Sequence, residues 1–277
     1  MRIRPATLDD VGKIVELHTY GRDVVGSLYE RYAQGGPWMA VETLAVHLNN
    51  LLLDDQMAAV AELDGKVVGE VEVFFSEEPI LGRLRNIAHV DVIEVHPAYR
   101  GRGIGTALME FVEEVARERG AELMTVQPDK EAEGFYEKLG FNVELFWGKL
   151  VRVCTGGSGS VIPASFTWEE VRDLELIAGR FQSSCSVFFS AVRDSIAGIH
   201  YTVETGRSGG SYYALRNLPG RNGAAMFLRG WLEDVKPVLA RARSLGFSEV
   251  LTVLPEGTES FGAEELGKIK VVGKELT

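Results

Sequence analysis

The stretch that most constrains the fold runs from Val90 to Thr106 and reads VDVIEVHPAYRGRGIGT. Its first six residues favour a β-strand, and the loop after them leads directly into a segment whose apolar residues recur at helical spacing. That segment ends at Gly120, where a left-handed C-cap is expected. A strand, a glycine-rich loop and a helix N-terminus together form an anion site, because outward-turned backbone N–H groups and the helix dipole both favour negative charge.

The spacing of glycines and arginines in this loop distinguishes between several known kinds of phosphate-binding motif. A dinucleotide-binding loop needs G-x-G-x-x-G and a P-loop needs G-x-x-x-x-G-K-[ST], and neither pattern is present. The loop has the order R-x-x-G-x-G, carried by Arg100, Gly103 and Gly105. In that order, after a strand that ends in V-x-P, it resembles the acyl-CoA pyrophosphate loop of the GNAT superfamily of N-acetyltransferases. The alternative is a surface turn that binds no ligand, since short motifs also match by chance.

A second segment carries the same resemblance. Residues 132–141 read AEGFYEKLGF, which matches the second GNAT motif, and IRPAT before an acidic helix start is how many GNAT chains begin. The resemblance covers residues 1 to about 153. One residue departs from the family pattern, because Asp129 stands where an asparagine is usual. That departure weakens any transfer of the asparagine's CoA contact to this chain.

The first half also predicts the elements around the two motifs. A short N-terminal strand leads to a helix that starts at Thr7 and turns His18 inward. Residues 57–63 and 67–75 alternate around Asp64-Gly65, which predicts a hairpin. Tyr29, Tyr32 and Trp38, in a helical region before that hairpin, are candidate acceptor contacts or core aromatics.

The second half repeats the pattern of the first without its chemistry. A glycine- and serine-rich stretch, TGGSGS, predicts a linker. We interpret five later segments as copies of first-half segments, with the copy of the second helix missing between Gly179 and Val187. They are a helix start at 167–171, a hairpin at 192–198, a phosphate loop at 221–225 that lacks the R-x-x-G-x-G order, a helix with Leu228, Trp231, Leu232, Val235 and Leu239 on one face, and a strand at 251–255.

We therefore predict an α/β fold of tandem GNAT-like domains, each a mixed, mostly antiparallel twisted sheet flanked by helices. The divisions are a catalytic domain at 1–153, the linker at 154–165 and a degenerate domain at 166–277. With 277 residues the chain has room for two modest domains.

Composition and charge narrow the class of function. The chain is 45% hydrophobic and 25% charged, which is ordinary for a soluble protein. A net charge of −11 argues against a general binder of nucleic acid or anionic membrane. Cys154 and Cys185 lie in apolar surroundings and read as buried thiols in a reducing compartment. No apolar run reaches the length of a membrane span, and MRIRPATLDD lacks the apolar core of a signal peptide. We expect a cytoplasmic protein without a metal.

The resemblance implies acetyl-CoA as cosubstrate and assigns roles to residues of the first half. The backbone N–H of Val95 would donate to the thioester oxygen, and the hydroxyl of Tyr136 would protonate the leaving thiolate, unless Tyr136 is only a core aromatic. The residues expected to bind the cofactor are Ile93, Glu94, Val95, Arg100, Gly101, Arg102, Gly103, Ile104, Gly105 and Thr106.

The general base has several candidates. In the family pattern the position that often carries a carboxylate base is His89, and Asp91 lies two residues further along the same strand. Histidine has the better unperturbed pKa for taking a proton near neutrality. A carboxylate such as Asp91 or Glu72 could act through a water molecule.

The leading hypothesis is direct acetyl transfer, in a ternary complex, to a primary amine of a small molecule or a peptide, by a monomer or homodimer. The alternative is a non-catalytic acyl-CoA sensor. Tyr136 favours the enzyme. The acceptor cannot be read from the sequence, because acceptor contacts come from variable loops.

Overall fold

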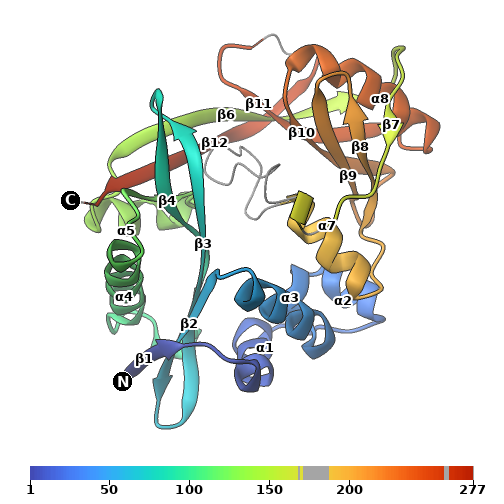
Figure 1. Ribbon diagram of the computed structural model, residues 1–277. Helices are drawn as coiled ribbons and strands as arrows, with labels where there is room; N and C mark the ends of the chain where they lie inside the picture. Colours follow the sequence, from blue (N-terminus) through green and yellow to red (C-terminus); the bar gives the residue numbers. More distant parts are fainter. Residues whose placement is uncertain (168, 171–186, 259–261, 277) are drawn as a thin grey trace. The chain divides into compact units, whose positions relative to one another are not determined.

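The computed structural model describes residues 1–167, 169–170, 187–258 and 262–276 (Figure 1). The described chain divides into two compact units. Unit 1 holds Met1–Leu145 together with the C-terminal segment that starts at Val271, and unit 2 holds the residues from Phe146 to Lys270. No helix in the described ranges is long and apolar enough to cross a membrane.

Unit 1 is built on a mixed sheet in the order β1-β2-β3-β4-β5-β12. Neighbouring strands are antiparallel, except that β4 and β5 are parallel. The elements are β1 (Arg2–Pro5), α1 (Val11–Thr19), α2 (Leu28–Ala33), α3 (Val41–Leu53), β2 (Met57–Leu63), β3 (Lys66–Ile80), β4 (Arg83–Val95), α4 (Ile104–Glu118), β5 (Leu123–Val126), α5 (Glu133–Lys138) and the end of β12 (Glu264–Glu275), with 3-10 turns at Leu8–Asp10, Gly36–Met39, Pro97–Tyr99 and Lys130–Ala132.

The predicted hairpin and the first helix start are confirmed. Asp64 and Gly65 join β2 to β3 with φ angles of 51° and 77°, the left-handed pair that a tight two-residue hairpin turn requires. At the N-terminus Thr7 and Asp10 form a capping box ahead of α1. Local sequence therefore decides both features.

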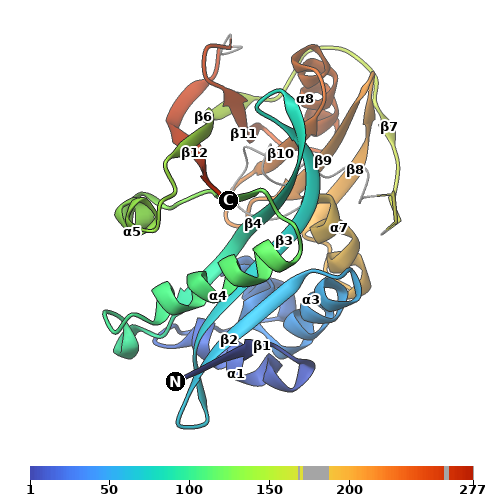
Figure 2. The ribbon, with the colours of Figure 1, turned by 60° about the vertical axis from the view of Figure 1, so that its left-hand side comes forward.

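Helices cover both faces of the sheet in unit 1. Figure 1 shows α4 and α5 on one side of β2–β4 and α1 and α3 on the other, and Figure 2 shows α4 lying across these strands. Val71 and Val73 of β3 pack in the core under α4, whereas Phe74 packs in the core under α1 and α3. Because side chains alternate along a strand, Glu70 and Glu72 face α1 and α3 as Phe74 does.

Strand β4 carries a bulge and then parts from β5. Its register with β3 aligns Val90 with Val73 and Val92 with Glu72, so Asp91 is the extra residue. Pairing with β5 ends at Val90, which lies opposite Val126. The residues of β4 after Val90 thus have no β5 partner in the described chain, and a gap opens beside the end of β4.

The last strand of the chain completes the sheet of unit 1. Residues 272–275 of β12 pair with β5 in antiparallel register. The buried guanidinium of Arg85 bonds both carboxylate oxygens of Glu275. Lys274 donates to Glu113 of α4 at 2.5 Å. Unit 1 is therefore continuous in space but not in sequence.

The strands of unit 2 are hydrogen-bonded in the order β6-β11-β10-β9-β8-β7. The order of elements is the same as in unit 1: a helix and a hairpin come first, followed by a strand, a helix and a second strand. The last two strands, β10 and β11, are parallel. The fold class predicted from the sequence, mostly antiparallel sheets flanked by helices, is confirmed. The elements are β6 (Val143–Cys154), β7 (Ile162–Pro163), α7 (Val187–Ile196), β8 (Thr202–Ser208), β9 (Ser211–Asn217), β10 (Gly223–Arg229), α8 (Val235–Ser244) and β11 (Glu249–Pro255), with a 3-10 turn at Leu232–Asp234.

Several assignments within the second half were wrong in position. Residues 192–196 belong to α7, and the hairpin is β8–β9 with its turn at Gly209-Gly210. Residues 221–225 form a turn and the start of β10, so the connection before α8 is Gly230 to Asp234. The errors share one cause. The two halves were aligned by short local similarities in sequence, and the matched residues belong to different kinds of element in the two halves.

The predicted long helix and the first cysteine also need correction. Leu228 lies in β10, α8 begins at Val235, and Trp231 between them is 66% exposed. A strand followed by a helix can imitate one apolar helical face when the sequence is short. Cys154 is exposed rather than buried, because it ends β6 at the edge of the core. Cys185, the start of the helix at 168 and 171, and the deletion between Gly179 and Val187 lie outside the described residues. The strand predicted at 251–255 is confirmed as part of β11.

Candidate active site

The loop before α4 has the backbone that an anion site needs. Gly101 and Gly103 have φ angles of 75° and 78°, and Gly103 is the N-cap of α4. L-residues rarely adopt this conformation, so glycine is required for backbone reasons. The space beside both glycines is open, with no atom within 4 Å of a built Cβ position. The first N–H groups of α4 have no intrahelical partners and face this space.

A pocket of about 540 Å³ lies against the loop and the end of β4. Nine of the ten residues predicted to bind the cofactor line it, and Arg102 is the exception. The guanidinium of Arg102 instead lies over the ring of Tyr99, 5.2 Å from its centroid. The structure thus brings the predicted residues together, and their role in binding remains a prediction. The full lining is Ile93, Glu94, Val95, Tyr99, Arg100, Gly101, Gly103, Ile104, Gly105, Thr106, Asp129, Glu131, Ala132 and Phe135.

The side chain of Arg100 is turned back toward β4. Its Nε donates to the carbonyl of Val95 at 2.9 Å, and its terminal nitrogen donates to Glu94 at 2.7 Å. The guanidinium is mostly exposed, and an exposed ion pair of this kind is weak. Arg100 is consequently positioned at the rim of the pocket, within reach of a more highly charged anion.

The hydrogen-bond pattern of β4 shows where the N–H of Val95 points. The N–H of His96 donates to Val68 of β3 at 3.0 Å. Residues of an antiparallel strand alternate between bonding toward one neighbour and away from it. Val95 therefore directs its N–H and carbonyl away from β3, toward the gap beside β4, where Arg100 already bonds the carbonyl. This is the geometry that an oxyanion donor requires.

The three candidate bases lie away from the pocket lining. His89 is buried in the part of β4 that pairs with β5, and its Nδ1 lies 2.8 Å from the hydroxyl of Thr125. Asp91 is the half-buried bulge residue. The carboxylate of Glu72 accepts hydrogen bonds from His47 at 2.8 Å and from Trp38 at 3.1 Å. Trp38 therefore contacts a buried carboxylate.

The ring of Tyr136 is buried in the core beneath α4. It packs edge to face with Phe135, which lines the pocket, and with Phe141. No described residue bonds its hydroxyl. Burial, and then the charge of Asp129, raises the pKa of Tyr136, so the phenol keeps its proton. Tyr136 does not line the pocket itself.

Sequence analysis missed one buried carboxylate on the same sheet. Glu70 of β3 is fully buried and lies 2.5 Å from Nε2 of His18 on α1. The alternation of Glu70 and Glu72 with valines reads as a solvent-facing strand edge. The prediction that His18 faces inward could have indicated Glu70, because a buried histidine needs a polar partner.

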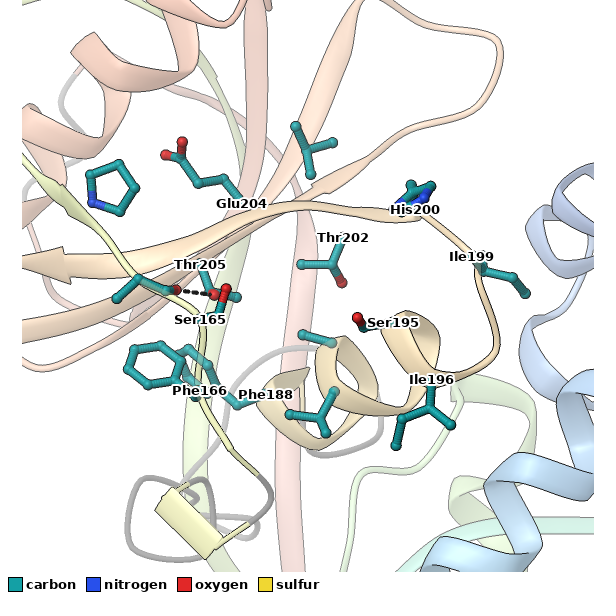
Figure 3. Close-up of a pocket in the computed structure, with 15 residues that line it drawn as sticks. Ser165, Phe166, Phe188, Ser195, Ile196, Ile199, His200, Thr202, Glu204 and Thr205 are labelled. Atoms are coloured by element: carbon teal, nitrogen blue, oxygen red, sulfur yellow. Dashed lines mark hydrogen bonds between the residues drawn. The ribbon is translucent and has the colours of Figure 1, made fainter.

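A second pocket, of about 470 Å³, lies within unit 2. Figure 3 shows Phe188, Ser195 and Ile196 approaching it from α7 and Thr202, Glu204 and Thr205 from β8. Thr205 donates to the carbonyl of Ala164 at 2.6 Å. None of the predicted site residues lies here. The pocket is beside α7, whereas the pocket of unit 1 is at the start of α4.

Comparison with known proteins supports the motif assignment. Residues 23–141 match the model of the acetyltransferase (GNAT) family. A glucosamine 6-phosphate N-acetyltransferase of Trypanosoma brucei brucei is 32% identical over 77 residues, which are 28% of this chain and 52% of that protein. An uncharacterized N-acetyltransferase of Methanocaldococcus jannaschii is 30% identical over 142 residues, 50% of this chain and 59% of that protein. The chain thus spans a little over half the length of these relatives.

Solved structures match over the whole chain. A GCN5-related N-acetyltransferase from Kribbella flavida aligns with a TM-score of 0.65 at 16% identity, covering 99% of this chain and 72% of its own. One from Anabaena variabilis aligns with a TM-score of 0.66 at 11% identity, covering 100% and 73%. At this identity the likeness shows the fold alone. The motifs and the family model agree that residues 23–141 carry an acetyltransferase (GNAT) family domain, and the solved structures share the fold of the chain.

Proposed function

We propose that the protein is an acetyl-CoA-dependent N-acetyltransferase that moves the acetyl group directly to a primary amine in a ternary complex. The observation that carries the proposal is the pocket at the start of α4, which unites the left-handed glycines, Arg100 and the gap beside β4. Glycine-lined helix starts favour phosphate, and the gap gives an extended chain access to the backbone of β4.

The residues present fit the chemistry of the transfer. The diphosphate of acetyl-CoA would lie against the N–H groups of Gly103 to Thr106, with the rim charge of Arg100 beside it. The thioester oxygen would accept from the N–H of Val95, which stabilises the oxyanion that develops during attack. The leaving thiolate would take a proton from Tyr136, whose ring packs against Phe135 of the pocket lining.

The acceptor is a primary amine on a small molecule or on a peptide. Since one relative carries the name glucosamine 6-phosphate N-acetyltransferase, amino sugar phosphates are the first acceptors to test. The cytoplasmic location and the monomeric or homodimeric state stay predictions from sequence.

Two measurements on the purified full chain test the function. Calorimetry with acetyl-CoA should give one site per chain. Release of CoA thiol with an amine panel, containing glucosamine 6-phosphate, an alkyl diamine and a lysine peptide, should show turnover. Tight binding without turnover of any amine would favour the acyl-CoA sensor instead.

A further inference from the structure

His18 and Glu70 form a pair on the face of the sheet opposite α4. Nε2 of His18 lies 2.5 Å from a carboxylate oxygen of Glu70. When Glu70 is ionised, its carboxylate accepts from Nε2–H, and Nδ1 of the neutral ring then presents a lone pair. No described residue bonds Nδ1. The pair therefore leaves one basic nitrogen available.

Exposure decides which member of the pair can meet another molecule. The side chain of His18 is 9% exposed, and that of Glu70 is 0% exposed. The ring of His18 stacks on Trp38 with 5.5 Å between centroids, which fixes its plane. His18 reaches the surface, while Glu70 can act only through His18.

The pair lies beside the end of β4 where the N–H of Val95 points into the gap. In the register of the sheet Glu70 is opposite Glu94, which lines the pocket, and Gly69 is opposite Val95. Helix α1 packs on both β3 and β4. Just after α1, the ring of Tyr20 lies 4.0 Å from that of His96. His18 is thus held over the strands that border the expected thioester position.

By comparison, the neighbouring pair of His47 with Glu72 is more deeply buried, and its carboxylate accepts more hydrogen bonds. Glu72 accepts from both His47 and Trp38, and its side chain and that of His47 are 0% and 5% exposed. Oε1 of Glu70, in contrast, has no hydrogen-bond partner in the described ranges. The same residue types on the same face therefore form one saturated pair and one that can accept another proton.

The charges around the pair keep one proton labile near neutrality. Burial, opposed by the hydrogen bond from His18 and assisted by the charge of Glu72, raises the pKa of Glu70 to about 7. The ionisable groups that face the pair are Glu72 on β3, His47 on α3 and Glu94 on β4. The carboxyl of Glu70 can therefore exchange a proton near neutrality.

We propose that His18, positioned by Glu70, takes the proton of a cationic primary amine acceptor; this rests on the proposed function. The ammonium gives one proton to Nδ1, and the freed lone pair forms the C–N bond to the thioester carbon. The C–S bond breaks, Tyr136 protonates the thiolate and regains a proton from the amine nitrogen, and His18 returns its proton to water.

The test compares His18→Gln, Glu70→Gln and the control His47→Gln in the full chain. Glutamine at 18 still donates to Glu70 but does not titrate near neutrality. Turnover of an amine that the parent acetylates should fall about 100-fold or more at pH 7, and should recover as pH rises and the amine deprotonates by itself. Glu70→Gln should lower turnover about tenfold and move the acidic limb of the pH–rate profile to lower pH, because the ring loses its anion. His47→Gln should keep the shape of the profile.

Each result has a definite consequence. Acetyl-CoA affinity, measured by calorimetry, should be equal in all variants, which separates proton transfer from folding and cofactor binding. An unchanged pH profile in His18→Gln, or the same change in His47→Gln, would overturn this inference and leave the transferase standing. A parent protein that binds acetyl-CoA but acetylates no amine would instead overturn the proposed function.

Discussion

The start of α4 in unit 1 and the start of α8 in unit 2 occupy the same place in the order of strands and helices within each unit. Each follows the first strand of a parallel pair, β4 with β5 and β10 with β11. At α4 the space beside Gly101 and Gly103 is open. At α8 the corresponding space is filled by the protein's own side chains.

Two hydrogen bonds and a carboxylate occupy the region before α8. The N–H of Trp231 donates to the hydroxyl of Ser211 at 2.7 Å, and that hydroxyl donates to the carboxylate of Asp234 at 2.5 Å. A Cβ on Gly209 would lie 2.3 Å from the same carboxylate. Asp234 thus places a resident anion at the start of the helix, where it satisfies the dipole.

This difference shows which features turn the N-terminus of a helix into a ligand site. Both units keep the strand–turn–helix geometry, so the fold alone does not create a phosphate site. In unit 1 the N-terminus of α4 opens onto a pocket, whereas in unit 2 Ser211 accepts from the N–H of Trp231 and the carboxylate of Asp234 occupies the space beside Gly209. The comparison can be tested by variants that change one unit and leave the other.

The largest expected effect is the loss of acetyl-CoA binding in Gly103→Glu. The substitution forces a left-handed backbone on an L-residue and puts a carboxylate where the diphosphate would lie. We expect affinity to fall at least about 100-fold by calorimetry, from like-charge repulsion in a desolvated site. Gly120→Glu is the matched control, since Gly120 has φ 74° and open space at the other end of α4. Equal affinity in both variants would refute the loop assignment.

The next effect compares a buried tyrosine in each unit. Tyr136→Phe removes only the hydroxyl, and turnover should drop about 100-fold or more while acetyl-CoA affinity stays the same. Tyr213 in unit 2 is buried and donates to Glu204 at 2.7 Å. Tyr213→Phe should lower the melting temperature without changing turnover per folded molecule. If Tyr136→Phe behaves like Tyr213→Phe, Tyr136 is a core aromatic.

A third pair of variants uses the two ends of β12, which serve different units. Glu275→Gln leaves the guanidinium of Arg85, whose side chain is 3% exposed, with only the more distant carboxylate of Glu122 at 4.0 Å. We expect a loss of about 1–3 kcal/mol in the free energy of unfolding. Glu264→Gln removes a pair with Arg152 that is far more exposed and should cost less than about 0.5 kcal/mol. Denaturant titration measures both, and equal losses would contradict the assignment of the last residues to unit 1.

The smallest effect concerns the helix starts at Thr7 and Thr167. Asp10 is 1% exposed and bonds Arg4 through both oxygens, whereas Glu170 caps Thr167 on an exposed surface. Hydrogen bonds from Arg4 lower the pKa of Asp10. A lowered native pKa stabilises the fold above the unfolded value near 4, and the gain is lost as pH falls.

Asp10→Asn should therefore cost about 1 kcal/mol at pH 7 and progressively less below about pH 4. Thermal melts between pH 3 and pH 7 measure the difference. Glu170→Gln should give a smaller change in melting temperature across this range. A cost of Asp10→Asn that is constant with pH would show that its carboxylate charge has no part in the cap.

The sequence determined the features that depend on local order. The glycines at 101 and 103, the two-residue turn at Asp64-Gly65 and the capping box at Thr7 each follow from one residue's backbone preference or one short contact. The pocket lining at the start of α4 follows for the same reason, since a strand, a loop and a helix start that adjoin in sequence also adjoin in space. These features needed no knowledge of the rest of the chain.

Tertiary structure decided the features that depend on residues far apart in sequence. Pairing of β12 with β5, the bond between Arg85 and Glu275, and the pair of His18 with Glu70 join segments whose separation hides any pattern. Whether the start of α8 is open or filled likewise depends on Ser211, which belongs to another strand. Local preferences fix which backbone a segment adopts, but burial and polar satisfaction between segments fix which surfaces remain for a ligand.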